Sequence, residues 1–143
     1  MQNSQEVEIL LVEDDVVDQQ GMKRALRDLH LSNPLRIADN GVAALKILRA
    51  GGDPLVCPPF MVLLDINMPM MNGIEFLHEL RADAKLKNTV VFILSTSKSP
   101  EDISLAYDLN VAGYIVKSDL KNSLMDALSM LDHYWGVVEL PRS

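Results

Sequence analysis

The stretch that decides the fold is Met61-Val62-Leu63-Leu64-Asp65-Ile66-Asn67-Met68-Pro69. Four apolar residues lead directly to one carboxylate, and a proline follows four residues later. A short apolar run rich in branched side chains is typical of a strand that is buried on both faces of a sheet. Asp65 then lies at the carboxyl end of that strand, where open parallel sheets bind their ligands. The stretch therefore predicts a site around Asp65.

The composition indicates one acidic domain. The chain has 143 residues, 48% of them hydrophobic, and a formal net charge of −7. We predict a single domain at 1–143, with a core at about 8–132 and an apolar C-terminal tail at 133–143. The charge argues against nucleic acid as a main partner, since a duplex requires a basic surface. The sequence has no bilayer-length apolar run, no signal-peptide pattern and a single cysteine, so we expect a cytoplasmic protein without membrane attachment.

Apolar runs alternate with amphipathic segments along the whole chain. The runs predict strands at 9–12, 35–38, 61–64, 89–94 and 111–116, each followed by a segment with helical spacing of apolar residues. Such alternation indicates parallel strands joined by right-handed crossovers. We therefore predict an α/β fold, a doubly wound five-stranded sheet in the flavodoxin-like order 2-1-3-4-5 with helices on both faces.

Polar side chains follow four of these strands. They are Glu13, Asp14 and Asp15 after the first strand, Asp65 after the third, Ser95 after the fourth and Lys117 after the fifth. Because the carboxyl ends of parallel strands meet at one edge, we expect these groups to lie together. Taken singly, each has an ordinary explanation as a helix cap, a turn residue or a solvated lysine. Their convergence favours a site.

The chemistry that this set favours is phosphoryl transfer. Crowded carboxylates repel one another unless a cation is present, and oxygen ligands together with water suit Mg²⁺. The ammonium of Lys117 and the hydroxyl of Ser95 are suited to phosphoryl oxygens, which leaves Asp65 as the nucleophile. Such a transfer requires mainly positioning and charge neutralisation.

These motifs resemble the receiver domain of two-component response regulators. The resemblance covers about residues 8–132 and rests on the runs Ile9–Asp15 and Leu64–Gly73 together with Ser95 and Lys117. It implies that Asp65 is the phosphoacceptor, that Glu13 and Asp14 are the acidic pair, that Asp14, Asp65 and the backbone carbonyl of Asn67 bind Mg²⁺, that Lys117 contacts the phosphoryl group, and that Ser95 and Tyr114 are the switch residues. Without the family, Tyr114 would be interpreted as a half-buried aromatic of the sheet.

The resemblance departs from the usual receiver pattern after Lys117. Receivers usually have a proline there, often after a cis peptide bond, whereas this chain has Ser118. A cis bond before a residue other than proline costs roughly 2.5–4 kcal/mol. The loop is therefore either trans and differently shaped, or strained.

Three shorter stretches, 72–77, 110–118 and 134–141, resemble the single-domain response regulators that partner cyanobacterial phytochrome histidine kinases. That likeness implies that a phytochrome-type histidine kinase donates the phosphoryl group. It also implies that this protein is a signalling phosphoacceptor and not an enzyme. It also implies a homodimer, in agreement with the prevalence of two-fold dimers, and we predict an interface of the fourth helix, fifth strand, fifth helix and tail. The alternative for the tail is that it folds back over the core.

Other functions share parts of this pattern. An aspartyl-phosphate hydrolase usually carries an acid two residues after its nucleophile, where this chain has Asn67. A flavin carrier would need phosphate-binding hydroxyls after the first strand, where this chain has carboxylates. A pseudo-receiver that acts only by protein contact remains an alternative.

Overall fold

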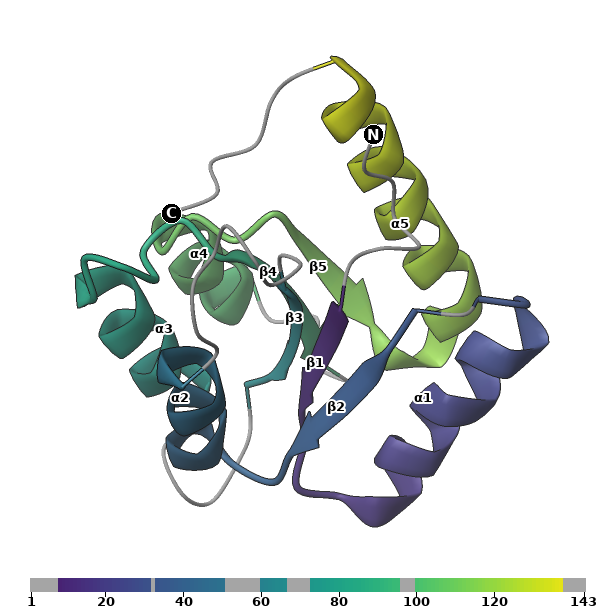
Figure 1. Ribbon diagram of the computed structural model, residues 1–143, viewed down its shortest axis with the longest axis horizontal. Helices are drawn as coiled ribbons and strands as arrows, with labels where there is room; N and C mark the ends of the chain where they lie inside the picture. The colour runs from purple at the N-terminus through teal and green to yellow at the C-terminus, as the bar shows by residue number, and fades with distance from the viewer. Residues whose placement is uncertain (1–7, 32, 51–59, 67–72, 96–99, 138–143) are drawn as a thin grey trace.

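The computed structural model describes residues 8–31, 33–50, 60–66, 73–95 and 100–137 (Figure 1). Within these residues, five parallel strands form one sheet in the order β2-β1-β3-β4-β5. The strands are β1 (Glu8–Val12), β2 (Leu35–Ala38), β3 (Phe60–Asp65), β4 (Val90–Ser95) and β5 (Gly113–Val116). The predicted fold class and strand order are confirmed.

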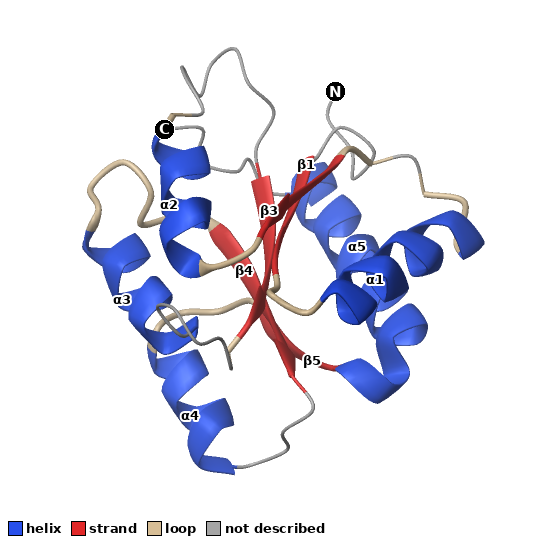
Figure 2. Cartoon of the chain, turned by 90° about the horizontal axis from the view of Figure 1, so that it is seen from below, coloured by secondary structure: helices blue, strands red, loops and turns tan. Residues whose placement is uncertain are grey.

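Helices cover both faces of this sheet. They are α1 (Val16–Asp28), α2 (Gly41–Arg49), α3 (Gly73–Ala82), α4 (Pro100–Asp108) and α5 (Leu120–Val137), with a short 3-10 turn, η2 (Lys117–Asp119), before α5. In Figure 2, α1 and α5 lie on one side of the strands, and α2, α3 and α4 lie on the other. Among the described helices, none is both long enough and apolar enough to cross a membrane.

The strand side chains divide between two apolar cores because successive residues of a strand point to opposite faces. On β1, Leu10 and Val12 belong to the cluster that also contains Phe76 and Leu77 of α3. Their neighbours on the same strand, Ile9 and Leu11, belong to the cluster under α1 and α5. Both faces of β1 are therefore buried, which explains its continuous apolar run.

The central strand β3 positions Asp65. It pairs with β1 on one side and with β4 on the other, and residues Met61 to Leu64 have no exposed surface. Asp65 is the last residue of the strand and pairs with Leu94 of β4. The strong burial of the preceding residues fixes where the carboxylate emerges at the edge of the sheet.

Two element boundaries differ by two residues or more from the predicted ones, and the others that differ do so by one residue. β5 begins at Gly113 instead of Val111. Asn110, just before the predicted start, has a left-handed backbone (φ 60°), which is incompatible with an extended strand at that residue. The apolar tail was predicted to begin at residue 133, but α5 continues to Val137, and the helix contains neither glycine nor proline before Gly136. Part of the predicted tail is thus helical, and 138–143 lie outside the described residues.

Candidate functional site

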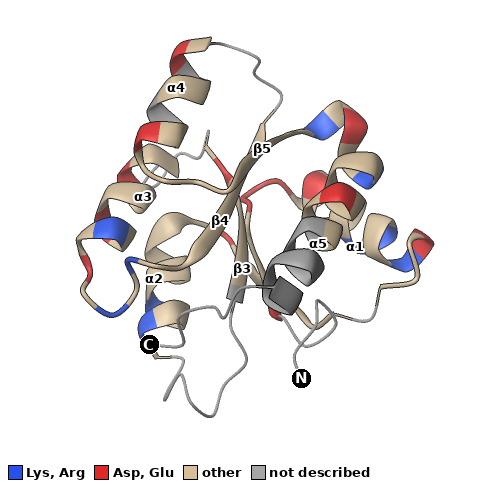
Figure 3. Cartoon of the chain, turned by 90° about the horizontal axis from the view of Figure 1, so that it is seen from above, with Lys and Arg blue, Asp and Glu red and all other residues tan. Residues whose placement is uncertain are grey.

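Three carboxylates meet at the carboxyl edge of the sheet. One oxygen each from Glu13, Asp14 and Asp65 lies within 4.8 Å of the others. Glu13 is 1% exposed and Asp65 is 6% exposed, whereas Asp14 is open to solvent. The backbone N–H of Glu13 donates to the carbonyl of Ala38 (3.0 Å), which extends the β1–β2 pairing and holds Glu13 at the pocket. In Figure 3 the acidic positions of this edge gather near the centre of the view, beside β5 and α1.

The start of α1 separates the roles of two consecutive acids. The side chain of Asp15 caps the helix, accepting hydrogen bonds from the backbone N–H groups of Val17 (2.8 Å) and Asp18 (3.4 Å). A carboxylate is a favoured cap because it satisfies otherwise unpaired backbone donors. From the sequence, Asp14 and Asp15 are both candidates for this cap, since both lie just before the helix. Since Asp15 is the cap, Asp14 is the acid that joins the pocket.

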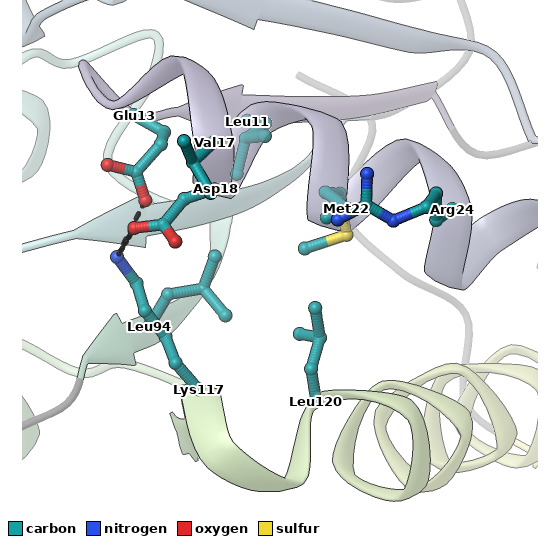
Figure 4. Close-up of a pocket in the computed structure, with 10 residues that line it drawn as sticks. Leu11, Glu13, Val17, Asp18, Met22, Arg24, Leu94, Lys117 and Leu120 are labelled. Carbon is teal, nitrogen blue, oxygen red and sulfur yellow. Dashed lines mark hydrogen bonds and ion pairs between the residues drawn. The ribbon is translucent and has the colours of Figure 1, made fainter.

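Lys117 reaches the pocket from the end of β5. Its Nζ lies 2.7 Å from Oε1 of Glu13, 2.8 Å from Oδ2 of Asp18 and 3.6 Å from Oδ2 of Asp65. Figure 4 shows the lysine side chain pointing toward Glu13 and Asp18. The Lys117–Ser118 peptide bond is trans and lies in η2. The loop therefore takes the differently shaped, trans form of the two alternatives left open by the sequence.

Asp18 is the site residue that the sequence analysis missed. It lies in the first turn of α1, a position where an acid is ordinarily explained by the helix dipole. Its ion pair with Lys117 joins residues 99 positions apart. The one available signal was its place one turn after Asp14, which puts both on the same side of a helix start.

Burial controls the ionisation of the pocket. Burial raises the pKa of Glu13 to about 7; the hydrogen bond from Lys117 opposes this rise, and the neighbouring Asp65 adds to it. Burial alone would lower the pKa of Lys117, but its hydrogen bonds to Asp18 and Glu13 and the charges of Asp65 and Glu13 outweigh that effect and raise it. Lys117 therefore stays protonated and is surrounded by more carboxylates than its single charge can neutralise.

This donor set fits a divalent cation. Carboxylate oxygens of Glu13 and Asp14 from the β1–α1 connection and of Asp65 from the end of β3 converge, and hard cations such as Mg²⁺ prefer oxygen ligands. One partly buried ammonium does not balance three carboxylates in the pocket and a fourth beside it. A second positive charge would relieve the remaining repulsion.

Two of the other predicted residues lie on the strands β4 and β5. Ser95 is the last residue of β4 and is fully buried. Tyr114 is half-buried on β5, opposite Ile93, and packs against the core under α2 and α3. Asn67 lies outside the described residues.

The family sequence profile described as "Response regulator receiver domain" matches residues 9–129. The chain belongs to the response regulator receiver family. The acidic pocket of this receiver contains Glu13, Asp14 and Asp65, so the resemblance inferred from the motifs is confirmed.

Individual relatives resemble this receiver over nearly its whole length. "Response regulator Rcp1" from Synechocystis sp. is 33% identical over 135 residues, which cover 93% of this chain and 92% of the relative. The structure of the phosphorylated cyanobacterial phytochrome response regulator RcpA matches with a TM-score of 0.72 and 33% identity, over 94% of this chain and 98% of that one. The Mn²⁺-bound form of Rcp1 matches with a TM-score of 0.71 and 31% identity, over 94% and 99% of the two chains.

Proposed function

We propose that this receiver accepts a phosphoryl group on Asp65 from a histidine kinase and passes the signal on by changing a protein-binding face. The observation that carries the proposal is the convergence of Asp65 with Glu13, Asp14 and Lys117 from three different strand ends. The phosphorylated state named for RcpA supports it. The protein would act as a signalling phosphoacceptor over a single domain, at 1–143.

In the proposed reaction, a carboxylate oxygen of Asp65 attacks the phosphorus of a phosphohistidine. A new P–O bond forms as the P–N bond breaks, and the departing imidazole keeps the electron pair and takes up a proton. Asp65 is nearly buried and ends a rigid strand, so it is held in place for in-line attack. Hydrolysis of the acyl phosphate by water would later restore the carboxylate.

The remaining pocket residues have proposed supporting roles. Asp14, Asp65 and the backbone carbonyl of Asn67 would hold Mg²⁺, which when bound supplies positive charge to the pocket. The Mn²⁺-bound form of Rcp1 supports a divalent cation here. Lys117 would contact a phosphoryl oxygen, and Glu13 would keep Lys117 in the pocket through its 2.7 Å contact.

The proposed output is a rearrangement of Ser95 and Tyr114. The hydroxyl of Ser95, at the end of β4, would move toward the phosphoryl group, and Tyr114 on β5 would turn inward after it. Tyr114 lines a surface hollow together with Tyr107 of α4, which is 49% exposed. Amide hydrogen exchange with and without a phosphoryl mimic tests this step, and unchanged exchange over α4 and β5 would leave a phosphate carrier without a switch.

The donor that fits best is a phytochrome-type histidine kinase. The likeness to RcpA, named as a cyanobacterial phytochrome response regulator, supports this choice. The cytoplasmic location predicted from the single cysteine belongs to the same proposal. Phosphotransfer from a purified, autophosphorylated phytochrome kinase, compared with an unrelated kinase, tests the partner by the ratio of the two initial rates.

We also propose a homodimer through α4, β5, α5 and the residues after α5. Tyr107 and Met125, from α4 and α5, are exposed apolar side chains on this part of the chain. Light scattering on the full chain and on a chain shortened after residue 132 tests this interface. A dimer mass that survives the truncation would remove the tail from it, and a monomeric full chain would remove the dimer.

The central experiment is phosphorylation by acetyl phosphate with Mg²⁺, followed by intact mass, in the wild type and in Asp65→Asn. We expect a gain of about 80 Da, one phosphoryl group bound covalently, in the wild type alone. No adduct in the wild type would favour the pseudo-receiver. Sustained release of phosphate from small phosphate esters would favour the aspartyl-phosphate hydrolase.

A further inference from the structure

The ammonium of Lys117 is shared among acids in an unequal way. An ammonium has three N–H donors, and two of them serve Glu13 at 2.7 Å and Asp18 at 2.8 Å. Asp65 lies 3.6 Å away, beyond hydrogen-bond length. Lys117, which is proposed to assist at Asp65, is therefore closer to Glu13 and Asp18 than to Asp65.

These two neighbours are not equivalent. Glu13 is nearly buried and belongs to the pocket, whereas the side chain of Asp18 is 40% exposed and projects from α1. Asp18 lies outside the group of three carboxylates that could bind a cation. Its side chain accepts a hydrogen bond from the ammonium of Lys117. The contact of Asp18 therefore pulls Lys117 toward α1 and away from β3.

A small cavity lies along the same side of Lys117. It measures about 200 Å³ and is lined by the charged residues Glu13, Asp18, Arg24 and Lys117 together with apolar side chains of β1, β4, α1 and α5, including Met22 and Leu94 (Figure 4). This volume is below that of typical ligand clefts. It leaves space beside the lysine stem, so packing alone does not fix the direction of the ammonium, and its ion pairs with Glu13 and Asp18 do.

We infer that Asp18 is a positioning residue that restrains Lys117, so that a phosphoryl group on Asp65 must compete with Asp18 for the ammonium. The inference rests on the proposed phosphoacceptor role of Asp65. A stronger Asp18–Lys117 ion pair therefore makes the phosphorylated state less favourable. Because the Asp18 side chain is 40% exposed, this pair is weak enough for a phosphoryl group to displace Asp18 while Glu13 keeps its contact with Lys117.

The test measures the affinity for beryllium trifluoride, a phosphoryl mimic, with Mg²⁺ by ¹⁹F NMR. Asp18→Asn should bind about two- to fivefold more tightly than the wild type, the factor expected for loss of one exposed ion pair. Asp18→Glu, which keeps a carboxylate, should stay close to the wild type. Asp18→Ser is a second neutral variant and should behave like Asp18→Asn.

The matched control is Asp28→Asn. Asp28 also lies on α1, is 42% exposed and pairs with a lysine, Lys121 of α5, at 2.7 Å, but it is remote from the pocket. Its loss should leave the affinity unchanged. Because removing any negative charge near the pocket favours an anion, Asp18→Asn is also measured in a Lys117→Met background, where we expect no gain.

Unchanged or weaker binding in Asp18→Asn would overturn the inference, as would an equal gain in the Lys117→Met background. These outcomes would leave the proposed function standing. A wild type that binds no beryllium trifluoride in the presence of Mg²⁺ would instead refute the proposed function, and this inference with it.

Discussion

The backbone of Gly73, the first residue of α3, lies directly against Ile66, the residue after Asp65. A Cβ at position 73 would come within 2.5 Å of the Cα of Ile66, and the N–H of Gly73 donates to the Ile66 carbonyl (3.0 Å). The start of α3 is thus bound to the end of β3 at a distance that a side chain does not permit. This contact sets the backbone that carries the phosphoacceptor candidate.

We expect Gly73→Ala to destabilise the fold by about 1–3 kcal/mol, because a backbone atom must move to admit the methyl group. Chemical denaturation measures the loss. The matched control is Gly21→Ala in α1, where the nearest atom to the new Cβ is 4.0 Å away. That change should stabilise the helix by about 0.5–1 kcal/mol. Equal effects at the two positions would contradict this account.

Arg81 of α3 provides a second test because, within the described part of the chain, its guanidinium donates to four backbone carbonyls. The acceptors, at 2.8–3.0 Å, are the carbonyls of Lys87, Thr89, Leu109 and Asn110. Burial lowers the pKa of Arg81, so these contacts have to offset a desolvation cost.

We expect Arg81→Met to lower the free energy of unfolding by about 2–4 kcal/mol, since it leaves several carbonyls without their donor. Arg49→Met is the comparison, because the Arg49 side chain is 50% exposed and forms ion pairs with Glu79 and Asp83. Its loss should cost less than about 1 kcal/mol. Urea unfolding of both variants separates the two values.

Substitutions of the adjacent residues Asp14 and Asp15 should have different effects, one on cation binding and the other on helix capping. Asp14 belongs to the carboxylate group, whereas Asp15 caps α1. Asp14→Asn should weaken Mg²⁺ or Mn²⁺ binding roughly tenfold or more, because it removes a charged oxygen ligand. Asp15→Ala should cost about 1 kcal/mol of stability with little change in cation affinity. Calorimetric titration and thermal unfolding of both variants test this, and a loss of affinity in Asp15→Ala alone would reverse the assignment.

The free energy of unfolding should depend on pH through the ionisation of Glu13. Its folded pKa, about 7, is above the ordinary value of 4.5, so its contribution to stability is complete below pH 4.5 and is lost as the pH rises through 7. In the absence of divalent cations, the wild type should lose up to about 3 kcal/mol across this window relative to Glu13→Gln. Urea unfolding at pH 5 and pH 8 in EDTA measures the difference, and parallel pH profiles would contradict it.

The fold could be predicted from the sequence because strands and helices depend on the spacing of apolar residues that are neighbours along the chain. The continuous apolar run before Asp65 predicted a strand buried on both faces, and β3 is the central strand with those residues fully buried. Alternation of strands and helices left few topologies, since parallel crossovers have one hand. The boundaries were less exact where no residue marks an end, as at α5, which continues through Tyr134 and Trp135 to Val137.

By itself, the sequence determined the strand order and brought Glu13, Asp14, Asp65, Ser95 and Lys117 to strand ends or the residues next to them, because periodicity and burial act over neighbouring residues. Only the tertiary structure decided which of two adjacent acids caps α1 and which acids hold Lys117. The pairing of Lys117 with Asp18 joins positions 99 residues apart. Its strength depends on the distance, burial and competing charges of side chains from separate elements, and these quantities exist only once the sheet has brought the elements together.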